Sequence, residues 1–558
     1  MNGAMRRAAC GMWNKAIVLS RIPHAASRIG WGRCAVCCGL WVTGCLLWAG
    51  VVQAATPCPG NQPLAFPTAE GFGRCAKGGR GGAIIEVTNL NDAGPGSLRA
   101  CVEASGPRTC VFRIGGTFDL NGTPLRVTAP FLTIAGHTAP GDGILIKNGG
   151  NNGNLTIKAS QVVVRHVRIR PGISPAGGNN NDAIQIIGND TSEVSDVIID
   201  HSSFSWGVDE TGSLWAWKRG VKYVTYQWNF ITEGLNCANH GEPAGECHST
   251  GFLSGGGPAM LTFHHNLLAH HAERGPLINA GSADVVNNVI YNVTSGTSLS
   301  ASGGPISVNV VKNMYLHGPN SSTRPPVALH DGGSFATASA VYLEGNRDAV
   351  FRPDDTLPET AIMFRWGSSP PLPLVSGRLS FPVLPSETSA PEARTRVLAS
   401  AGATKPVRDA VDARILHEVD TGTGRIIDSP ADVGGYPLYR SGTPPADTDH
   451  DGMPDSWETA HGLNPANASD GSAVTADGYT NVEHYLNELA GDTGGETGVP
   501  GDLTGDDQVT LADLRRLVAM LLGQAAPNDA AKTLATPTDQ LTLDDARALI
   551  QLLVTGGP

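Results

Sequence analysis

Short β-rich runs recur along the middle of the chain, and each reaches an asparagine that is followed by an apolar residue. These asparagines are Asn229, Asn266, Asn288, Asn313 and Asn346, at spacings of 37, 22, 25 and 33 residues. A repeat with a period of roughly 20–50 residues is typical of a solenoid, in which each turn buries its apolar face on the next. We predict an all-β parallel β-helix with the asparagines stacked amide on amide at one corner. In the alternative, a β-sandwich, strands usually recur about every 8–12 residues.

The unequal spacings place extra residues in loops between turns, and such loops commonly carry the functional site of a solenoid. The longest gap, of 37 residues, contains Cys237, His240, Cys247 and His248. A disulfide between the two cysteines would brace this loop. We therefore expect the functional site on the side of the coil from which this loop projects.

The composition agrees with a turn-rich β protein. Among 558 residues there are 70 glycines and 38 prolines, and 16% of residues are charged, which disfavours a helical bundle. The net charge of −12 is concentrated at the end, because the chain from Asp447 onward holds 19 acidic and 4 basic residues. The chain lacks the excess of basic residues that is typical of nucleic-acid-binding proteins.

The first 54 residues are predicted to be a secretory signal peptide. Six basic and no acidic residues occur in residues 1–55, an apolar run spans Cys34–Val52, and Val52-Gln-Ala54 offers small residues for cleavage. Cleavage would leave a secreted protein without a membrane attachment. A membrane anchor is the alternative, because the apolar run nearly spans a bilayer. Val42–Cys45 also resembles a lipoprotein cleavage box.

Six of the eleven cysteines lie beyond this leader. An even number in an exported chain indicates three disulfides, and six cysteines allow fifteen connectivities. A zinc site is the alternative, but close Cys/His pairs of the usual spacing are missing. We expect sequential pairing, namely Cys58–Cys75, Cys101–Cys110 and Cys237–Cys247.

Several stretches within residues 63–430 resemble the family-one polysaccharide lyases, the pectate lyases. They are Ala65–Gly73 (AFPTAEGFG), Val87–Arg99 (VTNLNDAGPGSLR), Ile134–Gly143 (IAGHTAPGDG), Ile199–Trp206 (IDHSSFSW), Phe263–Asn266 (FHHN) and Arg408–Arg414 (RDAVDAR). The resemblance implies a right-handed parallel β-helix over residues 55–430. It also implies calcium-assisted β-elimination of polygalacturonate, which gives 4,5-unsaturated oligogalacturonides.

The resemblance also assigns roles to individual residues. Asp182 and Asp209 match calcium-binding aspartates of the family, and Glu210 is a candidate replacement for a further carboxylate whose position holds Ser213. Hard oxygen ligands of this kind suit calcium. Arg274 matches the catalytic base of the family. Because arginine is nearly always protonated, a base role requires strong local perturbation or transient deprotonation.

The chain departs from the family where further arginines commonly follow the base, since Leu277 and Asn279 stand there. Fewer cations mean a weaker grip on a polyanion. The departure leaves open an esterified pectin, another uronate polymer or a loss of activity. We predict that the remaining substrate contacts come from Arg168, Arg170, His248 and His265.

The acidic tail divides into a linker at 431–446, a calcium-binding region at 447–495 and a final module at 496–558. Carboxylates at alternate positions before a glycine resemble the thrombospondin-type-3 calcium repeat, with the predicted ligands Asp447, Asp449, Asp451 and Asp455. An acidic disordered linker is the alternative. The final module resembles an α-helical, EF-hand-like dockerin, which would dock to a cohesin-bearing scaffold. Its predicted calcium ligands are Asp502, Thr504, Asp506, Gln508 and Asp513.

A second dockerin-like loop has lost most of its ligands, so a plain helix-turn-helix spacer is the alternative for 496–558. Two other functions remain open for the body of the chain. One is a non-catalytic carbohydrate-binding or adhesion β-helix, which would not need Arg274. The other is a glycoside hydrolase, for which Asp200 and Asp209 are the candidate carboxylate pair.

Overall fold

The computed structural model describes residues 58–150, 153–173, 181–188, 191–217, 219–238, 240, 247–367 and 370–492. All of these residues belong to one compact unit of the chain. The predicted signal peptide (1–54) and the dockerin-like module (496–558) lie outside the described residues, as do the predicted ligands of that module. Among the described residues, no helix has the length and apolar content that a membrane span requires.

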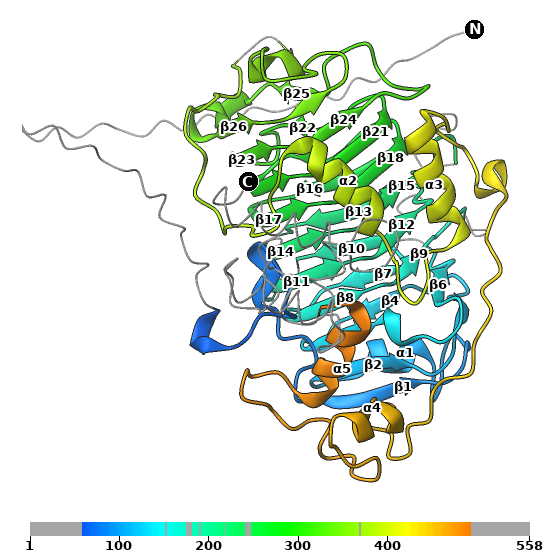
Figure 1. The fold of residues 1–558 in the computed structure, drawn as a ribbon. Helices are drawn as coiled ribbons and strands as arrows, with labels where there is room; N and C mark the ends of the chain where they lie inside the picture. The colour runs from blue at the N-terminus through cyan, green and yellow to red at the C-terminus, as the bar shows by residue number, and fades with distance from the viewer. Residues whose placement is uncertain are drawn as a thin grey trace, which may run out of the picture. The chain divides into compact units, whose positions relative to one another are not determined.

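Three long sheets stack strand upon strand along the chain (Figure 1). Sheet 1 holds β1 (Ala83–Val87), β2 (Arg108–Phe112), β5 (Leu132–Ala135), β8 (Val162–Arg165), β11 (Val194–Asp200), β14 (Val221–Gln227), β17 (Ala259–His264), β20 (Gly281–Val286), β23 (Ile306–Val311) and β26 (Ala340–Glu344). Sheet 2 holds β4 (Leu125–Val127), β7 (Leu155–Ile157), β10 (Ile184–Ile187), β13 (Glu210–Trp215), β16 (Thr250–Gly255), β19 (Leu277–Ile278), β22 (Ser298–Leu299), β25 (Val327–His330) and β28 (Met363–Trp366). Sheet 3 holds β3 (Gly116–Asp119), β6 (Ile144–Lys147), β9 (Arg168–Ile169), β12 (Ser203–Ser205), β15 (Phe230–Thr232), β18 (Leu267–His271), β21 (Val289–Val293), β24 (Met314–Leu316) and β27 (Arg347–Asp348).

Neighbouring strands within these sheets are parallel and lie about one turn apart in the sequence. The predicted parallel β-helix is therefore confirmed, and the β-sandwich is wrong. The topology fits the right-handed form, because crossovers between parallel strands are right-handed almost without exception. Apolar side chains from all three sheets fill the interior as one continuous core.

The predicted asparagine ladder runs up one corner of the coil and is fully buried. The Nδ2 of Asn229 donates to Oδ1 of Asn266 at 3.0 Å. The same bond recurs from Asn266 to Asn288 at 3.0 Å, from Asn288 to Asn313 at 2.9 Å and from Asn313 to Asn346 at 3.0 Å. Each Oδ1 also accepts a backbone N–H, so the ladder satisfies polar groups that the tight turn leaves inside.

Replacing Asn288 by alanine is expected to destabilise the coil. The backbone and side-chain N–H groups of Asn266 would lose their acceptor, and a buried unsatisfied group costs about 1–3 kcal/mol. Urea unfolding of Asn288→Ala against the exposed control Asn91→Ala would measure the difference. Equal midpoints for the two variants would show that the ladder contributes no stability.

The last part of the chain returns along the outside of sheet 3. Helix α2 (Ala390–Ser400) packs near β21 and β24, and α3 (Ala410–Thr421) lies toward the earlier turns. Ser389 and Asp409 cap these helices through side-chain hydrogen bonds. The apolar residues of both helices bury Trp206, Phe230 and Tyr291 of the coil. This cover occupies the outer face of sheet 3 and leaves sheet 2 as the candidate face for a site.

The segment 447–492 is folded, so the disordered-linker alternative is wrong for this part of the chain. It contains α4 (Asp455–Ala460) and α5 (Asn481–Ala490). Met453 and Leu486 pack on Ile84 of the first strand β1.

The remaining helices are short. Helix α1 (Leu98–Val102) lies at the same end of the coil as β1. The 3-10 helices are η1 (Pro59–Asn61), η2 (Phe72–Cys75), η3 (Gly136–Thr138), η4 (Gly333–Ala338), η5 (Glu359–Ile362) and η6 (Pro430–Val433).

The three disulfides follow the predicted sequential pairing. Cys58–Cys75, Cys101–Cys110 and Cys237–Cys247 have Cα–Cα distances of 5.6, 5.9 and 4.2 Å. The third closes the long insertion between β15 and β16, as expected for a braced loop.

Candidate active site

Three carboxylates meet at the start of two adjacent strands of sheet 2. Asp182 precedes β10. One turn further along the coil, Asp209 precedes the neighbouring β13 and Glu210 is its first residue. One oxygen of each residue lies within 4.8 Å of the others. We call these residues the carboxylate trio. The structure thus brings together the three metal ligands that the sequence predicted for the body of the chain.

The close approach of these three carboxylates is electrostatically unfavourable. Asp182 is buried, and burial together with the charge of Asp209 raises its pKa well above the usual range. Its Oδ2 accepts a hydrogen bond from the Ser213 hydroxyl at 2.5 Å, so Ser213 acts here as a donor to the trio. A divalent cation with a preference for oxygen ligands would relieve this repulsion, so the residues fit calcium.

Arg274 faces the trio from the turn between β18 and β19. Its Nη1 contacts Oε1 of Glu210 and lies 3.9 Å from Oδ1 of Asp209. The backbone of Arg274 has a φ of +62°, a left-handed conformation that is uncommon outside glycine and clusters at functional sites. Burial lowers the pKa of Arg274, while the charges of Asp209 and Asp182 oppose that shift.

Two histidines extend the trio on the side of the long insertion. The Nε2 atoms of His248 and His240 lie 3.0 and 3.3 Å from Oδ1 of Asp209, and the two rings stack with centroids 4.2 Å apart. The structure therefore places the predicted residue His248 at the edge of the site. His240 was not predicted, although its position between the two cysteines was the available signal.

A groove begins at Arg274 and continues across the outer face of sheet 2. Its cavity measures about 380 Å³. It crosses β19, β22, β25 and β28 and reaches the aromatic side chains of Phe364 and Trp366. Its other lining residues are Glu273, Leu277, Asn279, Thr294, Ser295, Ser298, Ser300, Ser302, Arg324, Ala328 and His330.

The predicted substrate contacts of Arg168 and Arg170 are wrong. Both side chains are fully buried, Arg168 against the segment that leads into α3 and Arg170 against α3 itself. Arg170 forms ion pairs with Asp409 at 2.5 Å and Asp412 at 2.8 Å, and Arg168 donates to the carbonyl of Ala403 at 2.8 Å. The two arginines do share one strand face, but that face holds the returning chain and is closed to a polymer.

The predicted substrate contact of His265 is also wrong. This side chain is fully buried and stacks on Trp228 with ring centroids 4.2 Å apart. Trp228 stacks in turn on His201, and His201 on His166, so the rings form a column along one corner of the coil. Ring stacking of this kind supports packing between successive turns.

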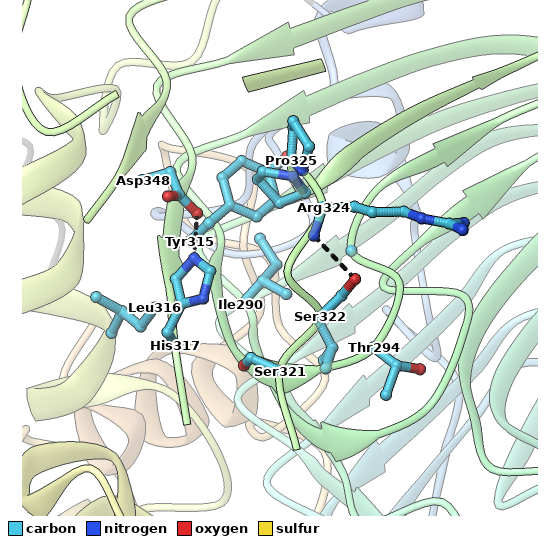
Figure 2. A pocket seen from close by; sticks show the side chains of 13 residues that line it. Ile290, Thr294, Tyr315, Leu316, His317, Ser321, Ser322, Arg324, Pro325 and Asp348 are labelled. Atoms are coloured by element: carbon cyan, nitrogen blue, oxygen red, sulfur yellow. Dashed lines mark hydrogen bonds and ion pairs between the residues drawn. The ribbon is translucent and has the colours of Figure 1, made fainter. Parts of the chain in front are cut away.

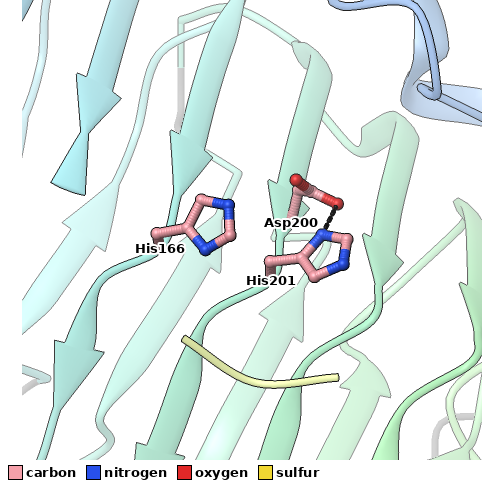
Figure 3. A group of neighbouring side chains, drawn as sticks. All are labelled: His166, Asp200 and His201. Carbon is pink, nitrogen blue, oxygen red and sulfur yellow. Dashed lines mark hydrogen bonds and ion pairs between the residues drawn. The ribbon is translucent and has the colours of Figure 1, made fainter. Parts of the chain in front are cut away.

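Asp200 belongs to this corner and not to the groove (Figure 3). It is fully buried, pairs with Arg165 at 2.8 Å and binds Nδ1 of His201 at 2.8 Å. A carboxylate held in this way cannot act on a sugar bound over sheet 2. The glycoside hydrolase alternative therefore loses one member of its proposed pair.

A second group of carboxylates lies in the C-terminal segment. Asp449, Asp451, Glu458 and Asp470 bring one oxygen each within 4.8 Å of the others, and we call them the acid cluster. Glu458 is 0% exposed, and neither of its carboxylate oxygens has a hydrogen-bond partner among the described residues. Burial, reinforced by neighbouring carboxylates, raises the pKa of Asp451 and of Glu458 to about 7.

The acid cluster differs from the predicted ligand set of this segment, because it contains Asp449 and Asp451 but not Asp447 or Asp455. Asp447 instead accepts backbone N–H groups of His450 and Gly452, at 2.9 and 3.2 Å. Asp455 accepts from the hydroxyl of Thr448 at 2.8 Å. Glu458 and Asp470 were missed. Glu458 could have been found from its place at the end of the acidic motif, whereas Asp470 comes from a separate loop.

Comparison with known proteins gives consistent results. A family model described as pectate lyase matches residues 138–342. The probable pectate lyase C of Aspergillus flavus is 35% identical over 436 residues, covering 76% of this chain and 94% of that protein. The probable pectate lyase C of Aspergillus terreus is 36% identical over 432 residues, with coverage of 76% and 94%. A solved pectate lyase from Bacillus sp. N165, in complex with trigalacturonate, aligns with a TM-score of 0.41 at 17% identity, covering 60% of this chain and 98% of that one.

Proposed function

Because the chain belongs to the pectate lyase family, we propose that it is an exported enzyme that cleaves galacturonan by calcium-assisted β-elimination. The observation that carries this proposal is the position of Arg274 opposite the carboxylate trio, at the head of a groove over sheet 2. Asp182, Asp209 and Glu210 would hold the calcium ion. Export is supported by the three disulfides, which are typical of oxidising compartments.

The elimination breaks the C5–H bond of a uronate residue, forms the C4=C5 double bond and breaks the C4–O4 bond. Calcium bound by the trio would neutralise the substrate carboxylate and so stabilise the negative charge that develops beside C5. In our proposal Arg274 receives the C5 proton, and the departing O4 takes a proton from water. Burial of the Arg274 guanidinium lowers its pKa in the direction that a base requires.

Ultraviolet absorbance of the unsaturated product tests the proposal. The purified protein would be mixed with polygalacturonate and with pectin, in calcium and in chelator. A calcium-dependent rise in absorbance is the expected result. Binding of either polymer without any absorbance change would instead favour the non-catalytic carbohydrate-binding alternative, for which the pairing of Arg274 with Glu210 would be structural.

Replacing Asp182 by asparagine is expected to raise the calcium concentration needed for half-maximal activity. Mutation of a residue that only orients a metal ligand typically lowers metal affinity roughly 10–100-fold, and mutation of a direct ligand should lower it at least as much. A calcium titration of activity would measure the shift, with Asp119→Asn on β3 as the carboxylate control. An unchanged titration would remove Asp182 from the ligand set.

Two further proposals concern the C-terminal part of the chain. We propose that the acid cluster binds a second calcium ion, because four converging carboxylates with unpaired oxygens suit that ion. We also propose that residues 496–558 dock to a cohesin-bearing scaffold. That second proposal rests on the sequence pattern of Asp502, Thr504, Asp506, Gln508 and Asp513.

A further inference from the structure

We propose that the groove beyond Arg274 binds methyl-esterified galacturonate residues, with Trp366 as a stacking surface, so that partly esterified pectin is the preferred substrate. This inference rests on the proposed function and names its substrate class. An unesterified residue would lie at the carboxylate trio, and uncharged residues would follow along sheet 2.

The floor of the groove consists of two rows of outward-facing residues. Strand register aligns Leu277, Ser298, Ala328 and Phe364 in one row. The next outward position of each turn gives the second row, Asn279, Ser300, His330 and Trp366. Residues between the rows point inward, and Ile278, Leu299 and Leu329 are buried in the core.

None of these eight floor residues carries a formal charge at neutral pH. Burial lowers the pKa of His330, so its imidazole is neutral. Three strand spacings separate β19 from β28, which is about 14 Å of groove. An unesterified galacturonan would lay several carboxylates on this stretch without a cation from the floor. Desolvation of a carboxylate that gains no paired cation is costly in free energy, whereas desolvation of an uncharged methyl ester carries no such cost.

Both arginines of the described lining lie at the ends of the groove, and Arg324 places one cation beside Trp366. Arg274 at the head of the groove is paired with Glu210, and Glu273 beside it contributes a negative charge. Arg324 lies at the far end, where its guanidinium carbon is 4.9 Å from the centroid of the Trp366 ring. Arg324 also lines a small pocket of about 20 Å³. Figure 2 shows its guanidinium directed away from the His317–Asp348 pair.

Two features of the groove indicate a sugar ligand. Trp366 is 51% exposed and lies at the end of the cavity. An exposed indole ring offers a flat apolar face to a pyranose ring or to an ester methyl group. The Oδ1 atom of Asn279 is buried and has no hydrogen-bond partner among the described residues, so it is an acceptor available to a sugar hydroxyl.

The test compares initial rates on polygalacturonate with rates on pectins of low, intermediate and full methyl esterification, at one saturating calcium concentration. The expected result is a maximum of kcat/KM at intermediate esterification. A maximum on polygalacturonate, with a steady fall as esterification increases, would overturn this inference and leave the lyase proposal intact. Absence of unsaturated product from every substrate would overturn both.

Two variants sharpen the test. Trp366→Ala is expected to raise KM on partly esterified pectin about 2–10-fold, with little change in kcat. This change in KM corresponds to the binding free energy of one aromatic contact. Trp217→Ala, a tryptophan of similar exposure (46%) outside the groove lining, is the control. Ser300→Lys adds a cation to the floor and should shift the kcat/KM ratio about 5-fold toward polygalacturonate, as expected for one exposed charge pair. An unchanged ratio in Ser300→Lys would count against the proposed role of floor charge.

Discussion

The variant Arg274→Ala is expected to lose lyase activity by about 10²–10⁴-fold in kcat, the usual contribution of a general base. The structure gives the physical reason. Arg274 is the cation that faces Asp209 and Glu210 at the head of the groove, and burial moves its pKa in the direction of deprotonation. Alanine cannot accept a proton, so the loss should appear in kcat at saturating substrate and calcium.

The division between kcat and KM decides which role Arg274 has. A rise in KM with kcat unchanged would mean that Arg274 binds the substrate carboxylate and that another group takes the proton. Arg126→Ala is the matched control, because Arg126 is an exposed arginine on β4 of the same sheet. Thermal unfolding of both variants in calcium would show whether loss of the Glu210 contact also damages the fold.

Local sequence features were sufficient to predict much of the fold. The spacing of Asn266, Asn288 and Asn313 predicted the buried ladder, because a stacked corner must recur once per turn. The resemblance to the pectate lyases pointed to the carboxylate trio, and the order of the cysteines suggested the three disulfides. The members of both sets lie at the ends of strands or in loops of the coil.

The errors arose where distant parts of the chain meet. Alternation correctly placed Arg168 and Arg170 on one face, but no local pattern showed that α3, more than 200 residues later, covers that face. Likewise, the burial of His265 depends on the ring column, which exists only when successive turns are stacked. Strand register was needed to show that the uncharged positions Leu277 and Asn279 continue as two uncharged rows to β28.

Removal of calcium is expected to destabilise the β-helix through the acid cluster, independently of the carboxylate trio. The segment that carries the cluster closes over the first turns of the coil. Glu483 pairs with Arg80 at 2.8 Å, and Asp447 lies 3.6 Å from Arg113. This contact covers the edge strand β1, and solenoids require such end caps.

The size of the effect follows from the linkage between binding and folding. An ion that binds the folded form stabilises it by about 2.7 kcal/mol at a concentration 100-fold above Kd. Glu458→Gln should abolish most of this calcium-dependent stabilisation, since Glu458 is the most buried member of the cluster. Urea unfolding in calcium and in chelator would measure it, with Glu103→Gln, the exposed residue that follows α1, as the control, expected to change stability by less than about 0.5 kcal/mol.

The two calcium sites can be separated by crossing the variants. Asp182→Asn should keep the calcium-dependent stability and lose calcium-dependent activity, whereas Glu458→Gln should show the reverse at saturating calcium. If Asp182→Asn removed the stability effect and Glu458→Gln left it intact, the stabilising ion would belong to the carboxylate trio. Burial, reinforced by the neighbouring carboxylates, raises the pKa of Asp451 to about 7, and the repulsion within the acid cluster would then have to be relieved by protonation.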